Sequence, residues 1–186
     1  MKNIIYLSII GILFFGKNAY SQSKTSNNFQ VHVNYLNVKE KARGGKDLGF
    51  GIGAEYHLNL VKRIGLQGIG GIGYERLSGN CPLCDSEWFQ NGYWAGIGLS
   101  KTFILKEKHQ FVGQIRYRFV GFERMEPELI DMDGTIVRWQ EANTPQDLVG
   151  FRFGYFVPIK LPVIISYTFE NGSFFRMNSV SLGFQF

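Results

Sequence analysis

Alternation of apolar with small or polar residues recurs along nearly the whole chain from residue 28 to residue 186. A period of two is typical of a β-strand, because successive side chains point to opposite faces. We count eight such segments, so the sequence predicts an all-β chain. The segments are residues 28–38, 48–58, 64–76, 90–103, 111–122, 148–157, 163–170 and 179–186.

Composition argues against helical architectures. The chain has 23 glycines in 186 residues, and glycine is costly inside helices. Beyond the N-terminal segment, no stretch approaches the roughly 18 continuous apolar residues that a membrane-spanning helix needs. Helical bundles and helical membrane proteins are therefore excluded.

The N-terminal segment is typical of a secretory signal peptide. It has Lys2, an apolar run over residues 4–15 and small residues before residue 22. The alternative is a membrane anchor, but this run is shorter than the roughly 20 residues a span requires. We expect cleavage of residues 1–21, which leaves 22–186 as one domain. The mature chain is only weakly basic, which argues against nucleic acid as a partner.

The two faces of the segments differ in bulk. One face carries Phe, Tyr, Ile or Leu on nearly every segment, and the other carries mostly Gly, Ser, Thr, Gln and a few charges. A soluble lipocalin-like barrel would turn its apolar face inward, but eight strands enclose too narrow an interior for so many aromatic rings. The bulky face therefore points outward, toward lipid. The sequence predicts an eight-stranded antiparallel up-and-down transmembrane β-barrel.

The lengths of the connections support this architecture. Long external loops and short periplasmic turns alternate in outer-membrane barrels. With the N-terminus on the periplasmic side, we assign residues 39–47, 77–88, 123–147 and 171–176 to the external connections. The shorter periplasmic connections are residues 59–63, 104–109 and 158–162.

Because of these patterns and its terminal phenylalanine, the mature chain resembles the small eight-stranded outer-membrane barrels that include the OmpA transmembrane domain and OmpX. The resemblance implies a monomer in the cell outer membrane, surrounded by outer-membrane lipid and lipopolysaccharide. It also implies that the last strand is a signal for the barrel-assembly machinery. The residues that match this signal are Val180, Leu182, Phe184 and Phe186.

The inward face carries six charged residues. Three are acidic and three are basic, and unpaired ions in a narrow lumen would be costly, so we predict a paired network that plugs the lumen. The alternative is a path for ions or small solutes, which eight strands leave little room for. The six residues are Glu55, Glu75, Arg116, Arg118, Arg152 and Glu170.

Two cysteines form the motif Cys81-Pro-Leu-Cys84. A redox site would need a thioredoxin-like setting, and zinc would need further ligands from the three histidines of the chain. We instead predict a loop disulfide formed in an oxidising compartment. The segment Asp131–Gly134 has the start of a calcium loop but lacks the later ligands, so we predict a turn. No metal or cofactor is expected.

Two families of eight-stranded barrels are enzymes, the lipid A palmitoyltransferase and deacylase, and both use a histidine and a serine. Here no histidine is followed two residues later by a serine, as in the deacylase. His32 lies on the inward face and His109 at a periplasmic connection. We therefore assign no catalytic residue and predict a structural or surface-interaction barrel, with a lipid-modifying enzyme or a narrow channel as alternatives.

The longest external connection, residues 123–147, contains Asp133-Gly134 between β-prone runs, which is a strong hairpin signal. We predict a protruding ribbon that contacts an extracellular protein; the alternative is a ribbon that only shields the barrel mouth. Acidic residues outnumber basic ones, which favours a cationic or calcium-bridged partner. The charged residues are Glu123, Arg124, Glu126, Glu128, Asp131, Asp133, Arg138, Glu141 and Asp147.

Overall fold

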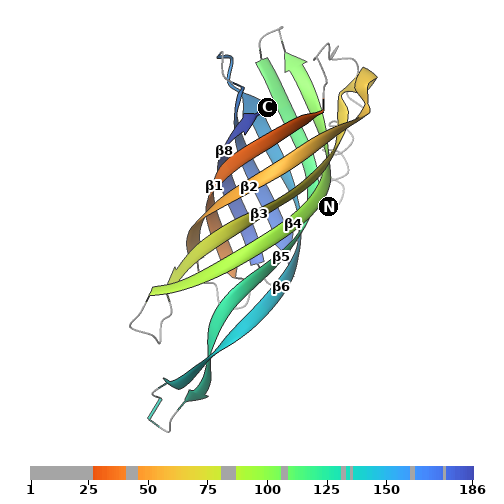
Figure 1. Ribbon diagram of the computed structural model, residues 1–186. Helices are drawn as coiled ribbons and strands as arrows, with labels where there is room; N and C mark the ends of the chain where they lie inside the picture. The colour runs from red at the N-terminus through yellow and green to blue at the C-terminus, as the bar shows by residue number, and fades with distance from the viewer. Residues whose placement is uncertain are drawn as a thin grey trace, which may run out of the picture.

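The computed structural model describes residues 27–40, 46–80, 87–105, 109–130, 133–134, 136–159, 162–173 and 175–186. Each strand pairs antiparallel with the next, and β8 pairs with β1 to close the barrel (Figure 1). The predicted eight-stranded architecture is confirmed. The strands are β1 (Asn28–Glu40), β2 (Lys46–Val61), β3 (Leu66–Asn80), β4 (Glu87–Leu105), β5 (His109–Ile130), β6 (Ile136–Phe156), β7 (Val163–Gly172) and β8 (Phe175–Gln185).

The last residue completes the closure. The N–H of Phe29 donates to the carbonyl of Phe186 over 3.0 Å, and the N–H of Phe186 donates back over 2.7 Å. The β1–β8 ladder then runs from Gln30↔Gln185 to Glu40↔Phe175. Closure pairs the backbone groups of the wall, as the hydrocarbon region of a membrane requires.

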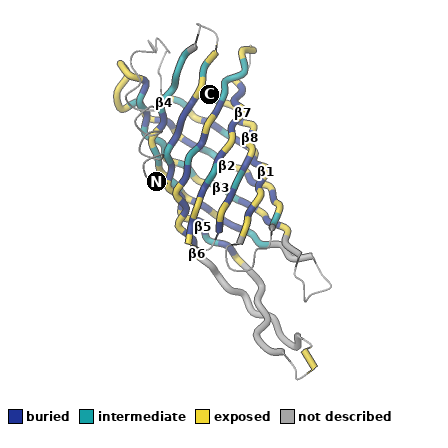
Figure 2. Tube along the Cα trace, turned by 180° about the vertical axis from the view of Figure 1, so that it is seen from behind, coloured by how far each residue is buried: buried dark blue, intermediate teal, exposed yellow. Residues whose placement is uncertain are grey.

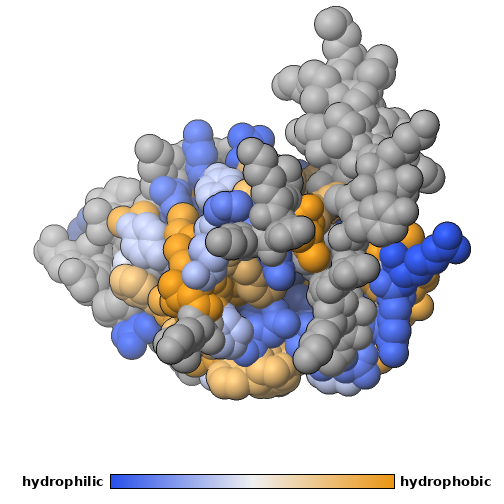
Figure 3. All heavy atoms as spheres, turned by 90° about the horizontal axis from the view of Figure 1, so that it is seen from above, coloured by the Kyte–Doolittle hydropathy of each residue, from blue (hydrophilic) through white to orange (hydrophobic). Residues whose placement is uncertain are grey.

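The strand beginnings and ends define two ends of the barrel. We call the end where β1 begins and β8 finishes the terminus end, and the opposite end the ribbon end (Figure 1). At the terminus end the short helix η1 (Lys62–Ile64) joins β2 to β3 and exposes Lys62 and Arg63. Figure 3 looks onto this end and shows hydrophilic side chains (blue) among hydrophobic ones (orange). Within the described ranges, no helix has the length and apolar character of a membrane span.

Buried and exposed positions alternate along the strands (Figure 2). Phe50, Ile72 and Ile97 on the outer face are about two thirds exposed, at 66%, 66% and 67%. Glu75 and Arg118 on the inner face are almost fully buried, at 0% and 3%. The prediction that the bulky apolar face points outward is therefore confirmed, and such an exterior requires lipid around it.

Tyrosines mark the border of this apolar band toward the ribbon end. The hydroxyl of Tyr74 donates to Asn91, and that of Tyr167 donates to Asn178. Amphipathic aromatic rings with a polar partner at the hydroxyl are typical of the interface between hydrocarbon and water. The outer wall thus changes from apolar to polar at this level.

Strands β5 and β6 continue beyond the rest of the wall. Pairing between β4 and β5 ends at Asn91↔Glu123, whereas β5 and β6 stay paired as far as Ile130↔Ile136. Asp133 and Gly134 lie at the turn, where Gly134 has a φ of 88° that suits glycine. The predicted hairpin is confirmed, and it protrudes as a two-stranded ribbon (Figure 1).

Several strands are longer than the sequence-based segments. Leu77 and Ser78, for example, were assigned above to a connection but belong to β3, whereas the long β5 and β6 agree with the predicted ribbon. Strands extend past the lipid-facing band, where the outward positions are no longer apolar and the alternation signal fades. The predicted signal peptide lies outside the described residues, as do Cys81 and Cys84, so both predictions stay open.

Candidate functional site in the lumen

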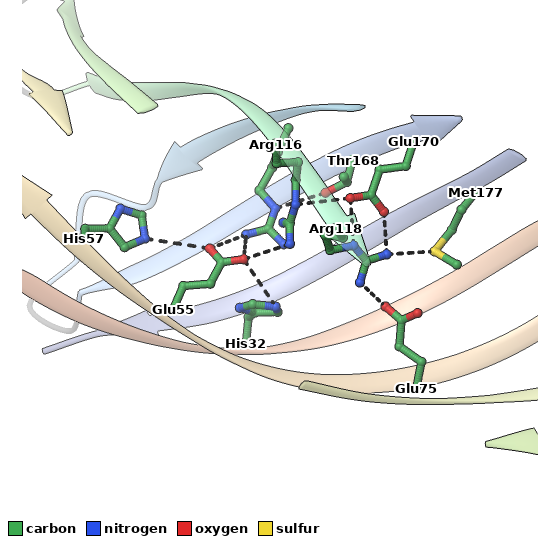
Figure 4. A network of polar contacts seen from close by, with 10 residues as sticks. His32, Glu55, His57, Glu75, Arg116, Arg118, Thr168, Glu170 and Met177 are labelled. Carbon is green, nitrogen blue, oxygen red and sulfur yellow. Dashed lines mark hydrogen bonds and ion pairs between the residues drawn. The ribbon is translucent and has the colours of Figure 1, made fainter. Parts of the chain in front are cut away.

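The six charged residues predicted to face inward meet in the middle of the lumen (Figure 4). They come from β2, β3, β5, β6 and β7, so strands distant in sequence place them together. All six are at most 7% exposed. The prediction of a paired network is confirmed by their contacts, described next.

Glu55 on β2 is held by two arginines. Arg152 Nη1 lies 3.0 Å from Glu55 Oε1 and 2.9 Å from Oε2. Arg116 Nη2 lies 3.1 Å from Oε1. Arg152 also donates from Nε to the hydroxyl of Thr168 over 3.0 Å, which fixes the plane of its guanidinium.

Glu170 on β7 shares Arg116 with Glu55. Arg116 Nε lies 3.1 Å from Glu170 Oε1, and Arg118 binds both oxygens of Glu170, with Nε at 2.9 Å from Oε1. Arg118 also donates to Glu75 over 2.6 Å. The six groups thus form one connected chain of alternating charge, which offsets the desolvation cost of each ion.

Trp94 on β4 lies against this chain. Its ring centroid is 5.5 Å from Arg116 Cζ and 5.0 Å from Arg118 Cζ, within cation–π range. A Cβ added at Gly53 would lie 2.6 Å from the Trp94 ring and 2.5 Å from His32 Nε2, so glycine on β2 makes room for both rings. The alternation over residues 90–103 places Trp94 on the inward face, but the sequence indicates no role for it. The feature of the sequence that could have indicated a role is this one bulky side chain on a face that otherwise carries mostly glycines.

The ribbon end of the lumen is apolar, which the sequence analysis missed. Leu36 and Phe122 are 0% and 1% exposed although they lie on the inner face. The predicted polar plug therefore fills only part of the lumen, because the inward positions past the network are apolar. The cluster comprises Leu36, Val38, Leu77, Trp94, Val120, Phe122, Leu148, Phe175 and Met177.

Little space remains between these side chains. A small cavity of about 10 Å³ beside Glu55, Trp94 and Arg116 has room for about one water molecule. The described residues contain no group of three or more His, Cys, Asp or Glu placed to hold a metal ion. The carboxylates are engaged by arginines, so the arrangement suits a structural plug better than proton transfer.

The histidines take up different positions. His32 and His57 are buried in the lumen, with Nε2 atoms 4.0 Å and 3.7 Å from the nearest oxygens of Glu55. His109 lies at the terminus end, where its Nδ1 is 2.8 Å from the hydroxyl of Tyr155. The inward placement of His32 is therefore confirmed, whereas the periplasmic location of His109 stays a prediction.

The residues of the predicted assembly signal all face outward, three of them on β8 and Phe186 directly after it. Phe186 is 75% exposed, and the alternate residues Ser179 and Ser181 are buried. This geometry agrees with the predicted faces of the strand. Recognition by assembly machinery stays a prediction. The four residues are Val180, Leu182, Phe184 and Phe186.

Comparison with known proteins identifies the fold. The crystal structure of Neisserial surface protein A (NspA) superimposes with a TM-score of 0.55 and 13% identity, covering 86% of this chain and 95% of that one. The chain has the fold of the small outer-membrane β-barrels. The resemblance to the OmpA and OmpX group is thus confirmed for the fold.

Two further solved structures match over similar lengths. Ail, the attachment invasion locus protein of Yersinia pestis, has a TM-score of 0.44 and 12% identity over 86% of this chain and 97% of that one. The N-terminal β-barrel domain of Pseudomonas aeruginosa OprF has a TM-score of 0.45 and 11% identity over 87% and 100%. No protein-family model and no curated protein sequence matches the chain.

Proposed function

We propose that this protein is a small barrel of the cell outer membrane whose wall is structural and whose β5–β6 ribbon binds a partner at the cell surface. The apolar exterior and the fold support the outer-membrane location. The observation that carries the binding role is the ribbon, whose two strands pair with each other while their outer edges have left the wall.

The two edges of the ribbon differ. On β5, pairing with β4 stops at Glu123, and Pro127 lies in the strand beyond it. On β6, the described pairing with β7 begins only at Leu148, and residues 136–144 contain no proline. A proline removes a backbone donor, so it blunts an edge against strand addition. The β6 edge over residues 136–144 is therefore the better template for an added strand.

The charge of the ribbon region indicates the kind of partner. Residues 123–147 carry seven acidic and two basic residues, which are named above. An extended partner segment with Lys or Arg would combine backbone pairing with charge attraction. A calcium ion bridging ribbon carboxylates to an anionic partner would be the other way to use this charge.

Replacing the ribbon with a short turn tests the proposal. Glu123 and Asn143 are register partners, so an Asn-Gly turn can join them without changing the pairing below. We expect the variant to keep its heat-dependent shift on gels, because the network and apolar cluster remain. Partner capture, measured by crosslinking on intact cells, should be lost.

A matched control retains the ribbon and changes only its tip. Asp133→Asn changes the Asp-Gly pair into Asn-Gly, which favours the same turn, and removes one charge, so partner capture should persist. Capture that survives removal of residues 124–142 would contradict the binding role. Such a result would leave the ribbon as a shield for the barrel mouth.

The filled lumen argues against a solute channel, since network and apolar cluster occupy the interior. Conductance of the purified barrel in a planar bilayer would contradict this interpretation. The lipid-modifying alternative would need a histidine at the outer lipid surface, whereas His32 and His57 are buried in the lumen. An unchanged mass of lipid A upon overexpression would agree with a non-enzymatic role.

A further inference from the structure

The half of the lumen toward the terminus end contains buried polar side chains that lack hydrogen-bonding partners in the described protein. Gln114 on β5 is 2% exposed, and neither its amide nitrogen nor its amide oxygen has a partner. Ser166 on β7 and Ser181 on β8 are buried register partners, and neither hydroxyl is satisfied. Buried polar groups are costly without a partner, so these groups call for a ligand inside the barrel.

The small cavity described above lies beside one of these groups. Gln114 lines it together with Glu55, Trp94 and Arg116, and the indole N–H of Trp94 is a second buried donor without an acceptor. Carboxylate and amide oxygens can accept a hydrogen bond there, and amide and indole N–H groups can donate one. A ligand that both donates and accepts suits this lining, and a volume of about 10 Å³ fits a single water molecule.

A file of polar side chains connects this cavity with the terminus end. Asn59 donates from its amide nitrogen to the exposed Asn27 over 3.4 Å and accepts from Gln67 over 2.9 Å. The hydroxyl of Ser100 donates to Gln67 over 3.4 Å. Ser100 is also the register partner of Gln114, and both side chains are buried on the inner face. These four residues before Gln114, which we call the polar file, thus lead from the mouth of the barrel to the cavity.

Among the described residues, the opposite half of the lumen has a different lining. Past the charged network, the next inward residues of β5 are Val120 and Phe122. Leu36 and Leu148 belong to the same apolar cluster, and all four are at most 1% exposed. Such a lining offers a water molecule no hydrogen bonds, so it stays dry. The charged network therefore lies between a polar half and an apolar half.

We propose that the terminus half of the lumen is a hydrated half-channel, which holds a water molecule beside Glu55 and Gln114 and is closed at its far end. Water exchanges along the polar file and stops at the charged network, because the apolar cluster fills the space beyond. The unpartnered Nε2 of His57, 3.7 Å from Glu55, belongs to the same half. The network is thereby in contact with solvent from one end of the barrel only.

The half-channel is independent of the ribbon's proposed role, since it concerns only the interior of the barrel. It also differs from a solute channel, because it has no exit at the ribbon end. If the ribbon end is external, as predicted, the half-channel opens toward the periplasm. Loss of partner capture by the ribbon variant would leave it intact.

Water-edited solid-state NMR of the protein in lipid bilayers tests the half-channel. Magnetisation is transferred from water protons to the protein, and its build-up is recorded at Cβ carbons in both halves of the lumen. Gln114 and Ser181 are each 2% exposed, and Val120 and Leu148 are each 0% exposed, so a dry lumen would give similarly slow build-up at all four. We expect severalfold faster build-up at Gln114 and Ser181. Equal build-up in the two halves would overturn the proposal.

A pair of matched variants tests the route. Ser100→Val interrupts the polar file next to Gln114 and should slow the build-up at Gln114 severalfold. Ser181→Val makes the same change at an equally buried position on β8 outside the file, and should leave the build-up at Gln114 as in the wild type. The gel shift on heating shows whether both variants are folded. An unchanged build-up with Ser100→Val, or equal slowing by both variants, would overturn the polar file as the route.

A substitution at Gln114 distinguishes a hydrated amide from a dry one. Gln114→Leu roughly keeps the volume of the side chain and removes both polar atoms. In a dry lumen, loss of an unsatisfied amide would lower the equilibrium constant for unfolding in urea. With water bound, the variant displaces an ordered water whose hydrogen bonds leucine cannot replace, so we expect that constant to rise severalfold. An unchanged or lower constant would overturn the water site.

Discussion

The lumen contains two layers that the same strands build in different ways. On β5, Arg116 and Arg118 belong to the charged network, and the next inward residues, Val120 and Phe122, belong to the apolar cluster. The charged layer depends on exact pairing, whereas the apolar layer depends on volume. The apolar layer also keeps water from the ribbon end of the network, which strengthens the ion pairs and raises the cost of breaking one.

Breaking the charged network should have the largest effect on the free energy of unfolding. Arg118→Met removes the cation shared by Glu75 and Glu170 and leaves buried carboxylates under-compensated. We expect a loss of about 3–5 kcal/mol in the free energy of unfolding. The measurement is urea unfolding in lipid vesicles, followed by tryptophan fluorescence.

A second substitution distinguishes charge imbalance from lost packing. Arg118 is the ion-pair partner of Glu75 among the described residues, so Arg118→Met with Glu75→Gln removes both members of that pair. The double variant should regain roughly 1 kcal/mol or more relative to Arg118→Met. A double variant less stable than Arg118→Met would mean that charge pairing does not govern this layer.

Truncating a side chain of the apolar layer should lower the free energy of unfolding by somewhat less. Leu36→Ala removes a side chain with no exposed surface and leaves a cavity, so we expect a loss of about 3 kcal/mol in the same unfolding experiment. The matched control is Leu58→Ala on the outer face, which is 47% exposed. Lipid can fill the space left there, so a loss as large as that of Leu36→Ala would contradict the sealed apolar layer.

The smallest effect is expected where the layers meet. Trp94→Phe keeps an apolar ring but reduces the aromatic face presented to Arg116 and Arg118, which should cost about 1 kcal/mol. Gly53→Ala should be less harmful in this background than in the wild type. The smaller ring relieves the contact of the added Cβ with Trp94 at 2.6 Å, although the contact with His32 Nε2 at 2.5 Å remains. Independent, additive losses would show that Gly53 does not make room for Trp94.

Much of the fold could be predicted because a barrel wall is specified locally. The alternation in residues 28–38 or 48–58 assigns each side chain to a face without reference to other strands. The Asp133-Gly134 hairpin was equally local. Strand ends were less predictable, since toward the ribbon end the outward positions become polar while inward positions such as Leu36 and Phe122 are apolar. The apolar residues thus change face along the strand, which obscures the pattern.

The candidate site was predictable only as a set of residues. Alternation placed Glu55, Arg116 and Glu170 inside, and charge balance required pairing among the six. The sequence pattern could not show that Arg116 bridges Glu55 and Glu170. That contact depends on the register of β2, β5 and β7 around the closed wall. The apolar cluster was missed for a related reason, as it gathers one or two inward residues from each of several strands.

The sequence by itself determined the architecture, the orientation of the two faces and the ribbon, because each follows from the order of residues along one strand or turn. Closure of the barrel decided what those residues meet. It brought Arg118 to Glu170 across 52 positions of sequence and set Gln114 beside Glu55 at the small cavity. Such contacts depend on register between strands, which is set by the packing of all eight strands together and is not written in any one of them.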